Sequence, residues 1–528
     1  MGVDSAAWRR EAFLTGAPRR EATADAPLTH GAPVTSSLWS LERGATVLAD
    51  GTTRFAVWAP RATRVDVVIT AGPSAGRHAL AAHAGGVFEG VVPGAGAGTD
   101  YAYSLDGGPP RPDPMSRWQP HGVHGPSRVV DPRTFTWTDA GWTGIAMPDY
   151  VFYELHVGTF TAAGTFDAVI PHLAELAALG VTAIELMPVA QFPGTRNWGY
   201  DGVHPFAAQN SYGGPEGLAR LVDAAHAHGL AVALDVVYNH LGPEGNYLGE
   251  FGPYFTDTYH TPWGAAVNFD GPGSDEVRRY VIDNALSWVT DFHVDALRLD
   301  AVHGIFDASA EHILAELAAR VHAQGARLGR RIQVIAESDL NDPRLVRPRA
   351  RGGYALDAQW SDDFHHAVHV ALTGERRGYY AGFHGARDVA AALERRFVYE
   401  GQYAPHRDRR HGASATDVPA DRFVIAIQNH DQVGNRARGE RLASLVPFAS
   451  LELAASLLLL APYVPLLFMG EEYGETHPFQ YFVSHTDPAL VEAVRRGREA
   501  ELESFAWEGP IPDPGAEATF TRSVLDRS

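Results

Sequence analysis

The sequence predicts an α/β protein: a (β/α)8 TIM barrel that follows a small N-terminal β-sandwich and carries a loop subdomain inserted after its third strand. Three observations support this prediction. Short alternating segments occur before residue 140, and from about residue 148 apolar strand-like runs alternate with helical stretches. The chain also has 528 residues, more than one ordinary core holds, so two or three domains are expected.

Composition and charge are those of an ordinary globular enzyme. Hydrophobic residues make up 45% of the chain, charged residues make up 20%, and the formal net charge is −20. This acidity disfavours nucleic acid and anionic membrane surfaces as partners and is compatible with a neutral ligand. The chain contains no cysteine, which excludes disulfides and thiolate metal sites and is typical of a reducing compartment.

Targeting signals are not apparent. The N-terminal sequence carries charges throughout and has no uninterrupted apolar stretch, so no secretory signal is expected. The most apolar run, Leu451–Phe468, contains Pro462 and Pro465, which favour a helix followed by a buried strand over a membrane span. We therefore expect a cytoplasmic enzyme.

The first 140 residues divide into two predicted segments. Residues 1–38 mix Ala, Arg, Pro and Thr without periodicity, which indicates a flexible tail. Residues 39–140 contain short alternating segments separated by Gly, Pro and Asp, which predict the β-sandwich. The clearest of these segments are Arg54–Trp58, Val65–Ile69 and Tyr101–Leu105.

Residues 148–505 are predicted to form the barrel. Eight apolar runs are mostly separated by amphipathic stretches such as Phe166–Leu179 and Glu216–His228, and a parallel barrel is the simplest fold that accounts for them. Residues 239–275, rich in Gly, Pro and aromatics, predict the subdomain inserted at the barrel mouth. The runs are Val151–His156, Val181–Met187, Leu230–Tyr238, Val294–Asp300, Ile332–Glu337, Ala355–Trp360, Phe423–Asn429 and Val464–Met469.

Three stretches around the last strands are interpreted separately. Residues 374–421, with the charged run Arg407–His411, predict a surface excursion. Residues 488–503 predict a closing helix. Residues 506–528 predict an irregular C-terminal tail, which is too short for a complete further β-domain.

Polar side chains follow the predicted strands at the end where a (β/α)8 barrel carries its active site. Asp235 lies on strand three, Asp300 ends strand four, Glu337 ends strand five and Asp431 follows strand seven. One carboxylate at a strand end can simply cap the next helix. Several carboxylates that converge in one cleft cost stability unless function requires them, so an active site is predicted here.

Spacing suggests roles for these acids. Arg298 and Asp300 are two residues apart on one strand, so their side chains point the same way and the guanidinium favours an ionised, nucleophilic carboxylate. Glu337 lies one β/α unit later and should face Asp300. An ionised neighbour and shielding from water should then raise the pKa of Glu337, as a general acid requires.

Four segments resemble the four signature regions of the α-amylase superfamily of retaining glycoside hydrolases, in the same order and spacing. They are DVVYNH (235–240), ALRLDAVH (296–303), IAES (335–338) and QNHD (428–431). The resemblance implies that Asp300 is the nucleophile, Glu337 the general acid/base and Asp431 the stabiliser of the transition state. It also implies that five residues line the subsite of the cleaved sugar: Asp235, His240, Arg298, His303 and His430.

Further stretches are similar to one branch of this superfamily, the maltooligosyltrehalose trehalohydrolases. They are AESDLNDPRL (336–345), QNHDQVGNRARGERL (428–442), TPWGAAVNFDG (261–271) and FMGEEYGE (468–475), with FAVWAP (55–60) in a sandwich similar to a carbohydrate-binding module. The resemblance implies hydrolysis of the α-1,4 bond next to the terminal trehalose of maltooligosyltrehalose, an α-glucan, with release of trehalose. It also implies pairing with a synthase that forms this substrate.

The sequence departs from the family pattern in two places. Ala296-Leu297 stands where Gly-Phe usually precedes the arginine, which implies a packing change. Relatives usually carry a β-domain after the barrel, which is absent or truncated here. The spacing of Asp300 and Glu337 bears on the stereochemistry, because carboxyl groups about 5–5.5 Å apart imply retention and about 6.5–9.5 Å inversion. Adjacent strand ends favour the shorter distance.

Aromatic residues near the predicted site are candidates for sugar contacts. Tyr200, after strand two, is a candidate platform under the sugar beside the cleaved bond, because an aromatic face suits the C–H surface of a pyranose. Trp263 and Phe269, in the inserted loops, could stack on trehalose or the next glucose, or could simply pack the loops. No cofactor and no metal are expected: His365 and His369 share a helix face without a completing carboxylate, and a solvated face explains them better.

Two other readings stay open. A branching or debranching enzyme of the same superfamily would use the same three acids. A pocket closed after two sugars fits trehalose, whereas an open groove fits a branch or acceptor chain. A non-catalytic glucan-binding protein is the second alternative, although such proteins usually lose one of the acids that this chain retains.

Overall fold

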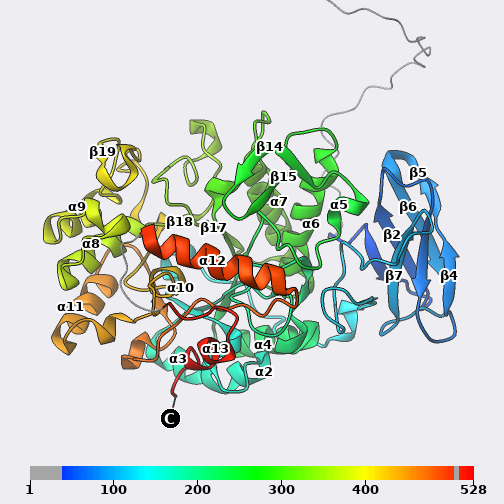
Figure 1. Ribbon diagram of the computed structural model, residues 1–528, viewed down its shortest axis with the longest axis horizontal. Coiled ribbons are helices and arrows are strands. Elements are labelled where there is room, and N and C mark those ends of the chain that lie inside the picture. Colours follow the sequence, from blue (N-terminus) through cyan, green and yellow to red (C-terminus); the bar gives the residue numbers. More distant parts are fainter. Residues whose placement is uncertain (1–38, 505–510, 528) are drawn as a thin grey trace, which may run out of the picture. The chain divides into compact units, whose positions relative to one another are not determined.

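A computed structural model of the chain describes residues 39–504 and 511–527 (Figure 1). The predicted tail at 1–38 and the start of the predicted C-terminal tail lie outside the described residues. The described chain opens with eight strands: β1 (Gly44–Val47), β2 (Thr53–Trp58), β3 (Val65–Ile69), β4 (Gly76–Ala79), β5 (Ala81–His83), β6 (Val87–Val92), β7 (Asp100–Leu105) and β8 (Ser127–Arg128).

These strands form two four-stranded antiparallel sheets, with the orders β1-β2-β6-β5 and β4-β3-β7-β8. Phe55 of one sheet packs edge to face on Tyr101 of the other, with ring centroids 4.9 Å apart, and both side chains are buried. The predicted N-terminal β-sandwich is therefore present, with alternate side chains turned into the space between the sheets.

A closed barrel of eight parallel strands follows, in the order β10-β13-β16-β17-β18-β21-β22-β9. Every strand overlaps one of the eight predicted apolar runs, so the predicted barrel is confirmed. The strands are β9 (Phe152–Leu155), β10 (Ala183–Leu186), β13 (Ala231–Val236), β16 (Ala296–Leu299), β17 (Gln333–Ala336), β18 (Ala358–Trp360), β21 (Phe423–Ala426) and β22 (Val464–Phe468).

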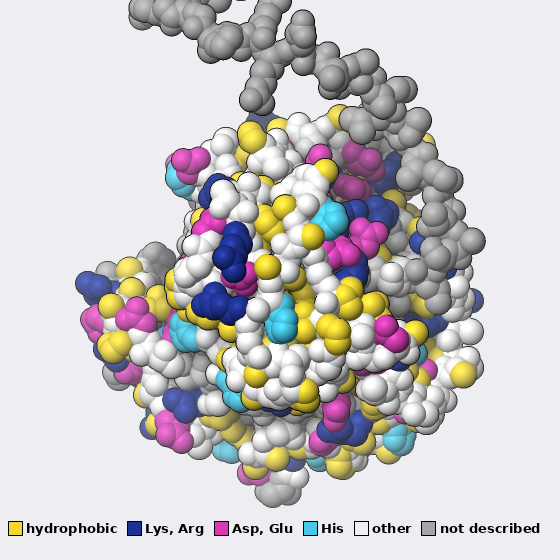
Figure 2. Space-filling view, turned by 90° about the vertical axis from the view of Figure 1, so that its right-hand side faces the viewer, with side chains coloured by type: hydrophobic (Ala, Val, Ile, Leu, Met, Phe, Trp, Pro, Cys, Tyr) yellow, Lys and Arg dark blue, Asp and Glu magenta, His cyan; other side chains and the backbone are white. Residues whose placement is uncertain are grey.

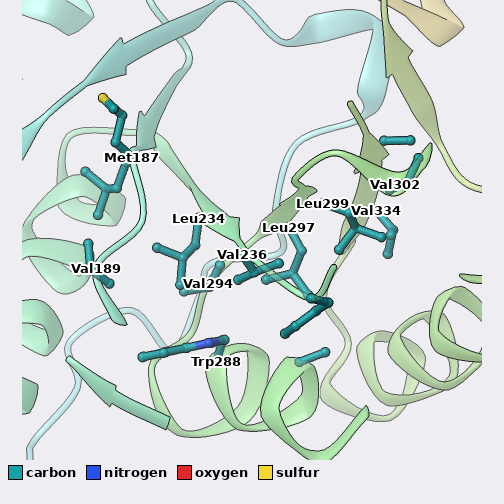
Figure 3. Packing of buried hydrophobic residues seen from close by; sticks show 14 of the residues in the cluster. Met187, Val189, Leu234, Val236, Trp288, Val294, Leu297, Leu299, Val302 and Val334 are labelled. Atoms are coloured by element: carbon teal, nitrogen blue, oxygen red, sulfur yellow. The ribbon is translucent and has the colours of Figure 1, made fainter. Parts of the chain in front are cut away.

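Alternation along the strands separates the inside of the barrel from its outer wall. In β13, Ala233 packs among the residues that fill the barrel, whereas Leu234 belongs to the larger core outside it. Figure 3 shows Leu234 and Leu297 of neighbouring strands on the same side as Trp288 of α6 (Ser274–Asp291). The period of two then turns Asp235 to the inside, at the barrel mouth.

Helices cover the outer wall of the barrel. The predicted helix over residues 166–179 is wrong in one respect: it is divided at Pro171, because proline removes a backbone donor and clashes with the preceding turn. A 3-10 turn, Ile170–His172, separates the two parts. These helices are α1 (Val157–Phe160), α2 (Phe166–Val169), α3 (Leu173–Leu179), α4 (Gly214–Ala227), α6, α7 (Ile313–Leu328), α8 (Asp362–Thr373) and α11 (Phe448–Leu459). Two further helices, α9 (Ala386–Arg395) and α12 (Pro488–Ser504), follow the sixth and the eighth strand.

Excursions between these elements surround the barrel mouth. Within 239–275 lie α5 (Leu248–Phe251) and a hairpin of β14 (Phe255–Thr261) and β15 (Gly264–Val267). The excursion at 374–421 contains α9 and a second hairpin, β19 (Tyr403–Ala404) and β20 (Arg409–Arg410). Two further elements follow strands of the barrel: the pair β11 (Ala190–Gln191) and β12 (His204–Ala208), and α10 (His430–Gly434).

The C-terminal residues are more regular than the sequence predicts. Within the described part of 506–528, Glu517–Arg522 form a short helix, α13. The chain beyond it is fixed to the barrel, because the Leu525 amide donates to the Thr159 carbonyl at 3.0 Å and the Leu525 side chain is buried. The expectation of an irregular segment is corrected at α13.

The described surface carries charges of both signs. Figure 2 shows acidic and basic side chains interspersed on the face that carries the N-terminal strands. Among the helices of residues 39–504 and 511–527, none has the length and apolarity needed to cross a membrane.

Candidate active site

Strand register brings the predicted acids to one place at the barrel mouth. Asp235 of β13 pairs with Arg298 of β16. The Glu337 amide donates to the Leu299 carbonyl at 2.9 Å, so Glu337 leaves β17 at the level where Asp300 leaves β16. Because Asp235, Arg298, Asp300 and Glu337 all belong to the inward-facing set, their side chains converge.

A single buried guanidinium connects these acids. Arg298 has no exposed surface, and its Nη1 donates to both oxygens of Asp235 at 2.8 Å and to Oδ1 of Asp300 at 2.8 Å. Its Nη2 lies 3.7 Å from Oε2 of Glu337. The Trp360 ring covers the guanidinium at 4.4 Å, which adds a cation–π contact. The predicted nucleophile and the predicted acid therefore meet the same cation.

The two acids have different surroundings. Both oxygens of Asp300 accept hydrogen bonds, from Arg298 at 2.8 Å and from Asn239 Nδ2 at 2.8 Å, as an ionised carboxylate does. Burial raises the pKa of Glu337 well above its usual range, against the effect of Arg298 and together with the negative charge of Asp300. Asp300 is thus arranged as an acceptor and Glu337 as a proton donor.

A strained backbone position links the two acids. Ala301, directly after Asp300, has a φ of 39°, in the left-handed region that residues with a Cβ rarely occupy. Its amide donates to Oε2 of Glu337 at 2.6 Å. The turn at Ala301 thus directs a backbone donor at Glu337, which fixes that carboxyl group relative to the strand of Asp300.

A second hydrogen-bonded chain runs beneath the site. The Tyr200 hydroxyl donates to Oδ2 of Asp235 at 2.6 Å and lies 2.7 Å from Nε2 of His430. Nδ1 of His430 lies 2.5 Å from Oε1 of Glu154, a buried residue of β9. Burial alone would lower the pKa of His430, but Glu154 and Asp431 raise it to about 9. His430 is therefore an imidazolium that donates to Tyr200.

A cleft of about 640 Å³ opens above these residues, a volume in the usual range for a ligand site. Asp235, Arg298 and His430 are at most 3% exposed and do not line the cleft. They contact residues that do line it, such as Asp300 and Tyr200. Seven of the predicted residues line the cleft: Tyr200, His240, Trp263, Asp300, His303, Glu337 and Asp431.

The two aromatic candidates in the inserted loops behave differently. Trp263, between β14 and β15, is 45% exposed and lines the cleft beside His240 and His303, with ring centroids 6.0 and 5.7 Å away. The prediction that Phe269 contacts a sugar is wrong, because its side chain is 1% exposed and packs in the core. Phe269 lies in a bend after β15, within a run of buried residues from Ala266 to Phe269, so a strand period of two does not apply to it.

Several residues that the sequence analysis missed also line the cleft. Asp339 follows Glu337 by two residues, and its Oδ2 accepts from Arg407 Nη2 at 2.8 Å. Asp362 starts α8 after the sixth barrel strand; burial, with Asp339 and Asp431, raises its pKa to about 7. Because Asp362 directly follows a predicted barrel strand, the sequence could have predicted it at the barrel mouth. Arg407 comes from the predicted surface excursion, and nothing in the sequence indicated that it reaches the cleft.

Helix α12 forms one wall of the cleft. The residues that it contributes, Val494, Gly497 and Arg498, lie three and four positions apart and therefore on one face. Nη2 of Arg498 donates to the Gly434 carbonyl in α10, the helix that carries Asp431, at 2.7 Å. The predicted closing helix thus also shapes the site.

The histidines of α8 are not on a solvated face, so that prediction is wrong. His365 and His369 are 4% and 5% exposed. Nε2 of His365 lies 2.9 Å from the Tyr380 hydroxyl, and the Tyr380 ring stacks on His369 with centroids 4.3 Å apart. Among the described residues, no group of three or more His, Asp or Glu side chains has an arrangement that would hold a metal ion.

Two segments of the chain match known domain families. Residues 130–260 match the α-amylase catalytic domain, and residues 42–117 match carbohydrate-binding module 48, the isoamylase N-terminal domain. The chain is also similar to a solved structure titled as a putative α-amylase from Salmonella typhimurium, with a TM-score of 0.86 and 43% identity over 92% of this chain and 82% of that one.

Curated relatives give a finer comparison. The chain is 50% identical to malto-oligosyltrehalose trehalohydrolase of Saccharolobus solfataricus, over 90% of this chain and 82% of the relative. It is 51% identical to the Arthrobacter ramosus enzyme of the same name, over 90% and 83%. A 1,4-alpha-glucan branching enzyme of Corynebacterium jeikeium is 30% identical over 62% of this chain and 50% of the relative.

Proposed function

This chain belongs to the malto-oligosyltrehalose trehalohydrolase family of the α-amylase superfamily, and we propose that it hydrolyses the α-1,4 bond next to the terminal trehalose of maltooligosyltrehalose, releasing trehalose. The contact of Asp300 and Glu337 with one buried arginine under a cleft supports the chemistry, and the identity of 50–51% to trehalohydrolases over 90% of the chain supports the choice of substrate. An enzyme that builds the trehalose end onto a malto-oligosaccharide is required to supply this substrate, and we propose such a synthase as its functional partner.

We assign the first chemical step to the two acids at Arg298. Glu337 gives its proton to the glycosidic oxygen while Asp300 attacks the anomeric carbon, so the C–O bond to trehalose breaks and a glycosyl ester with Asp300 forms. The raised pKa of Glu337 supports this role, because the group must hold a proton near neutral pH. Trehalose then leaves with the transferred proton.

The second step restores both acids. Glu337, now ionised, removes a proton from a water molecule, and the resulting hydroxide attacks the same carbon and releases Asp300. Two inversions at one carbon give net retention. The malto-oligosaccharide product therefore starts as the α-anomer.

The remaining residues act on the sugar between these steps. Asp431, whose side chain is 41% exposed, is placed to accept hydroxyl hydrogen bonds and to stabilise the positive charge of the transition state. Tyr200 and His240 line the cleft and are our candidates for contacts with the same ring. Trp263 is our candidate for stacking beyond it.

The alternative function, that of a branching enzyme, would use the same acids, so the two functions are distinguished by the substrates that the chain cleaves. The purified chain is incubated with maltooligosyltrehalose and, separately, with a plain malto-oligosaccharide of equal length. We expect fast release of trehalose from the first and slow cleavage of the second. Equal rates would contradict the trehalohydrolase proposal, formation of branched product would support the alternative, and binding without any cleavage would support a non-catalytic glucan-binding protein.

A further inference from the structure

One wall of the cleft contains a glycine that its own helix does not need. Helix α12 (Pro488–Ser504) is otherwise built largely from Ala, Leu, Glu and Arg, which favour helix, whereas glycine in a helix interior is unfavourable relative to alanine. Gly497 lies past the middle of this helix and lines the cleft between Val494 and Arg498. Gly497 therefore makes α12 less stable than alanine would at the same position.

Packing within the protein does not explain Gly497. A Cβ added at this position meets no atom of the described residues within 4 Å. Gly434 in α10 is the opposite case, because a Cβ there would lie 2.1 Å from the Trp198 ring. Gly497 is also not among the glycines with positive φ, so an L residue fits its backbone.

The space in front of Gly497 is the cleft itself. The residue is exposed, and it shares its helix face with Val494 and Arg498, so a side chain at 497 would project into the volume that these residues line. The wall cannot move away freely at this point, because Arg498 is 7% exposed and donates to the Gly434 carbonyl at 2.7 Å.

We propose that Gly497 is a specificity-determining position, whose missing side chain leaves room for a sugar ring of the bound glucan to lie against the backbone of α12. This inference rests on the proposed function, because it takes the cleft as the glucan site. Glycine is the residue that lets a ligand approach a helix backbone most closely. The small loss of helix stability at Gly497 is then offset by the room that the missing side chain gives the substrate.

The test uses Gly497→Ala and Gly497→Leu in the full chain, since both new residues favour helix. We expect the melting temperature of Gly497→Ala to be unchanged or about 1 °C higher. The KM for maltooligosyltrehalose should rise about threefold in Gly497→Ala and at least about tenfold in Gly497→Leu, with kcat changed much less, because ground-state and transition-state binding are obstructed alike. A KM at the wild-type value in both variants would overturn the proposal.

Ala489→Leu is the matched control. Ala489 is exposed near the start of the same helix, about 12 Å along the axis from Gly497 and outside the cleft lining, so the same added side chain should leave KM unchanged. A rise in KM for this control, or a KM rise at 497 that comes with a lower melting temperature, would indicate a general disturbance of α12 and would overturn the proposal.

A binding measurement keeps this inference separate from the proposed reaction. In the Glu337→Gln background, the Kd for maltoheptaose is measured by calorimetry with and without Gly497→Leu. We expect the substitution to raise the Kd by at least about tenfold. Absence of trehalose release by the wild-type chain would count against the proposed reaction, whereas an unchanged Kd would count against the role of Gly497.

Discussion

The charge on His430 offers a quantitative test of how the site is built. Glu154 lies directly behind His430, and both side chains are at most 1% exposed. Glu154→Gln keeps the shape of the side chain and removes its charge. We expect His430 to lose its proton near neutral pH in this variant, because burial then dominates and lowers its pKa.

The size of the effect follows from the pKa of His430. Its value of about 9 compares with about 6.5 for an unperturbed histidine, a difference worth about 3 kcal/mol. Because the folded-state pKa is the higher one, this stability is fully present below about pH 6.5 and is lost as the pH rises through 9. The wild type should exceed Glu154→Gln in stability by up to about 3 kcal/mol at pH 6, and the difference should shrink by about that amount at pH 10.

Urea unfolding at pH 6 and pH 10 measures this double difference. Glu175→Gln serves as the control, because Glu175 has an exposed side chain on α3. Its difference from the wild type should be small at both pH values. A Glu154→Gln difference that is the same at pH 6 and pH 10 would refute the assignment of a charged His430.

Three further predictions address the cleft. Asp362→Asn removes a negative neighbour that helps to raise the pKa of Glu337, so the high-pH fall in kcat/KM should move to lower pH; an unmoved profile would argue against Glu337 as the acid. Tyr200→Phe breaks the hydrogen bond to Asp235, and steady-state kinetics should show kcat/KM lower by about 10- to 100-fold, with wild-type values contradicting a role for the hydroxyl in positioning Asp235. Trp263→Ala should raise KM about three- to tenfold with kcat largely kept, and an unchanged KM would leave Trp263 as loop packing.

The sequence predicted correctly the features that depend on the pattern along a single strand. Apolar runs located all eight barrel strands, the period of two placed Arg298 and Asp300 on the same side, and the spacing of one β/α unit placed Glu337 opposite Asp300. The same logic could have found Asp339 and Asp362. Phe269 was misassigned because it lies in a bend after β15, and its burial there is set by tertiary packing.

Contacts between segments far apart in the chain were not predictable in this way. Arg407 reaches Asp339 from a hairpin 68 residues later, and α12 reaches the cleft by way of Arg498 and α10. The burial of His365 depends on Tyr380, which belongs to a later excursion. Local periodicity contains no information about where such excursions fold back, because their position is set by tertiary packing.

The stereochemistry of the first product tests the central claim most directly. Proton NMR during the first minutes of maltooligosyltrehalose hydrolysis records the anomeric signal of the new reducing end before it equilibrates. Attack by Asp300 with proton transfer from Glu337, followed by water, predicts that the α-anomer appears first. Initial appearance of the β-anomer would contradict the two-step mechanism.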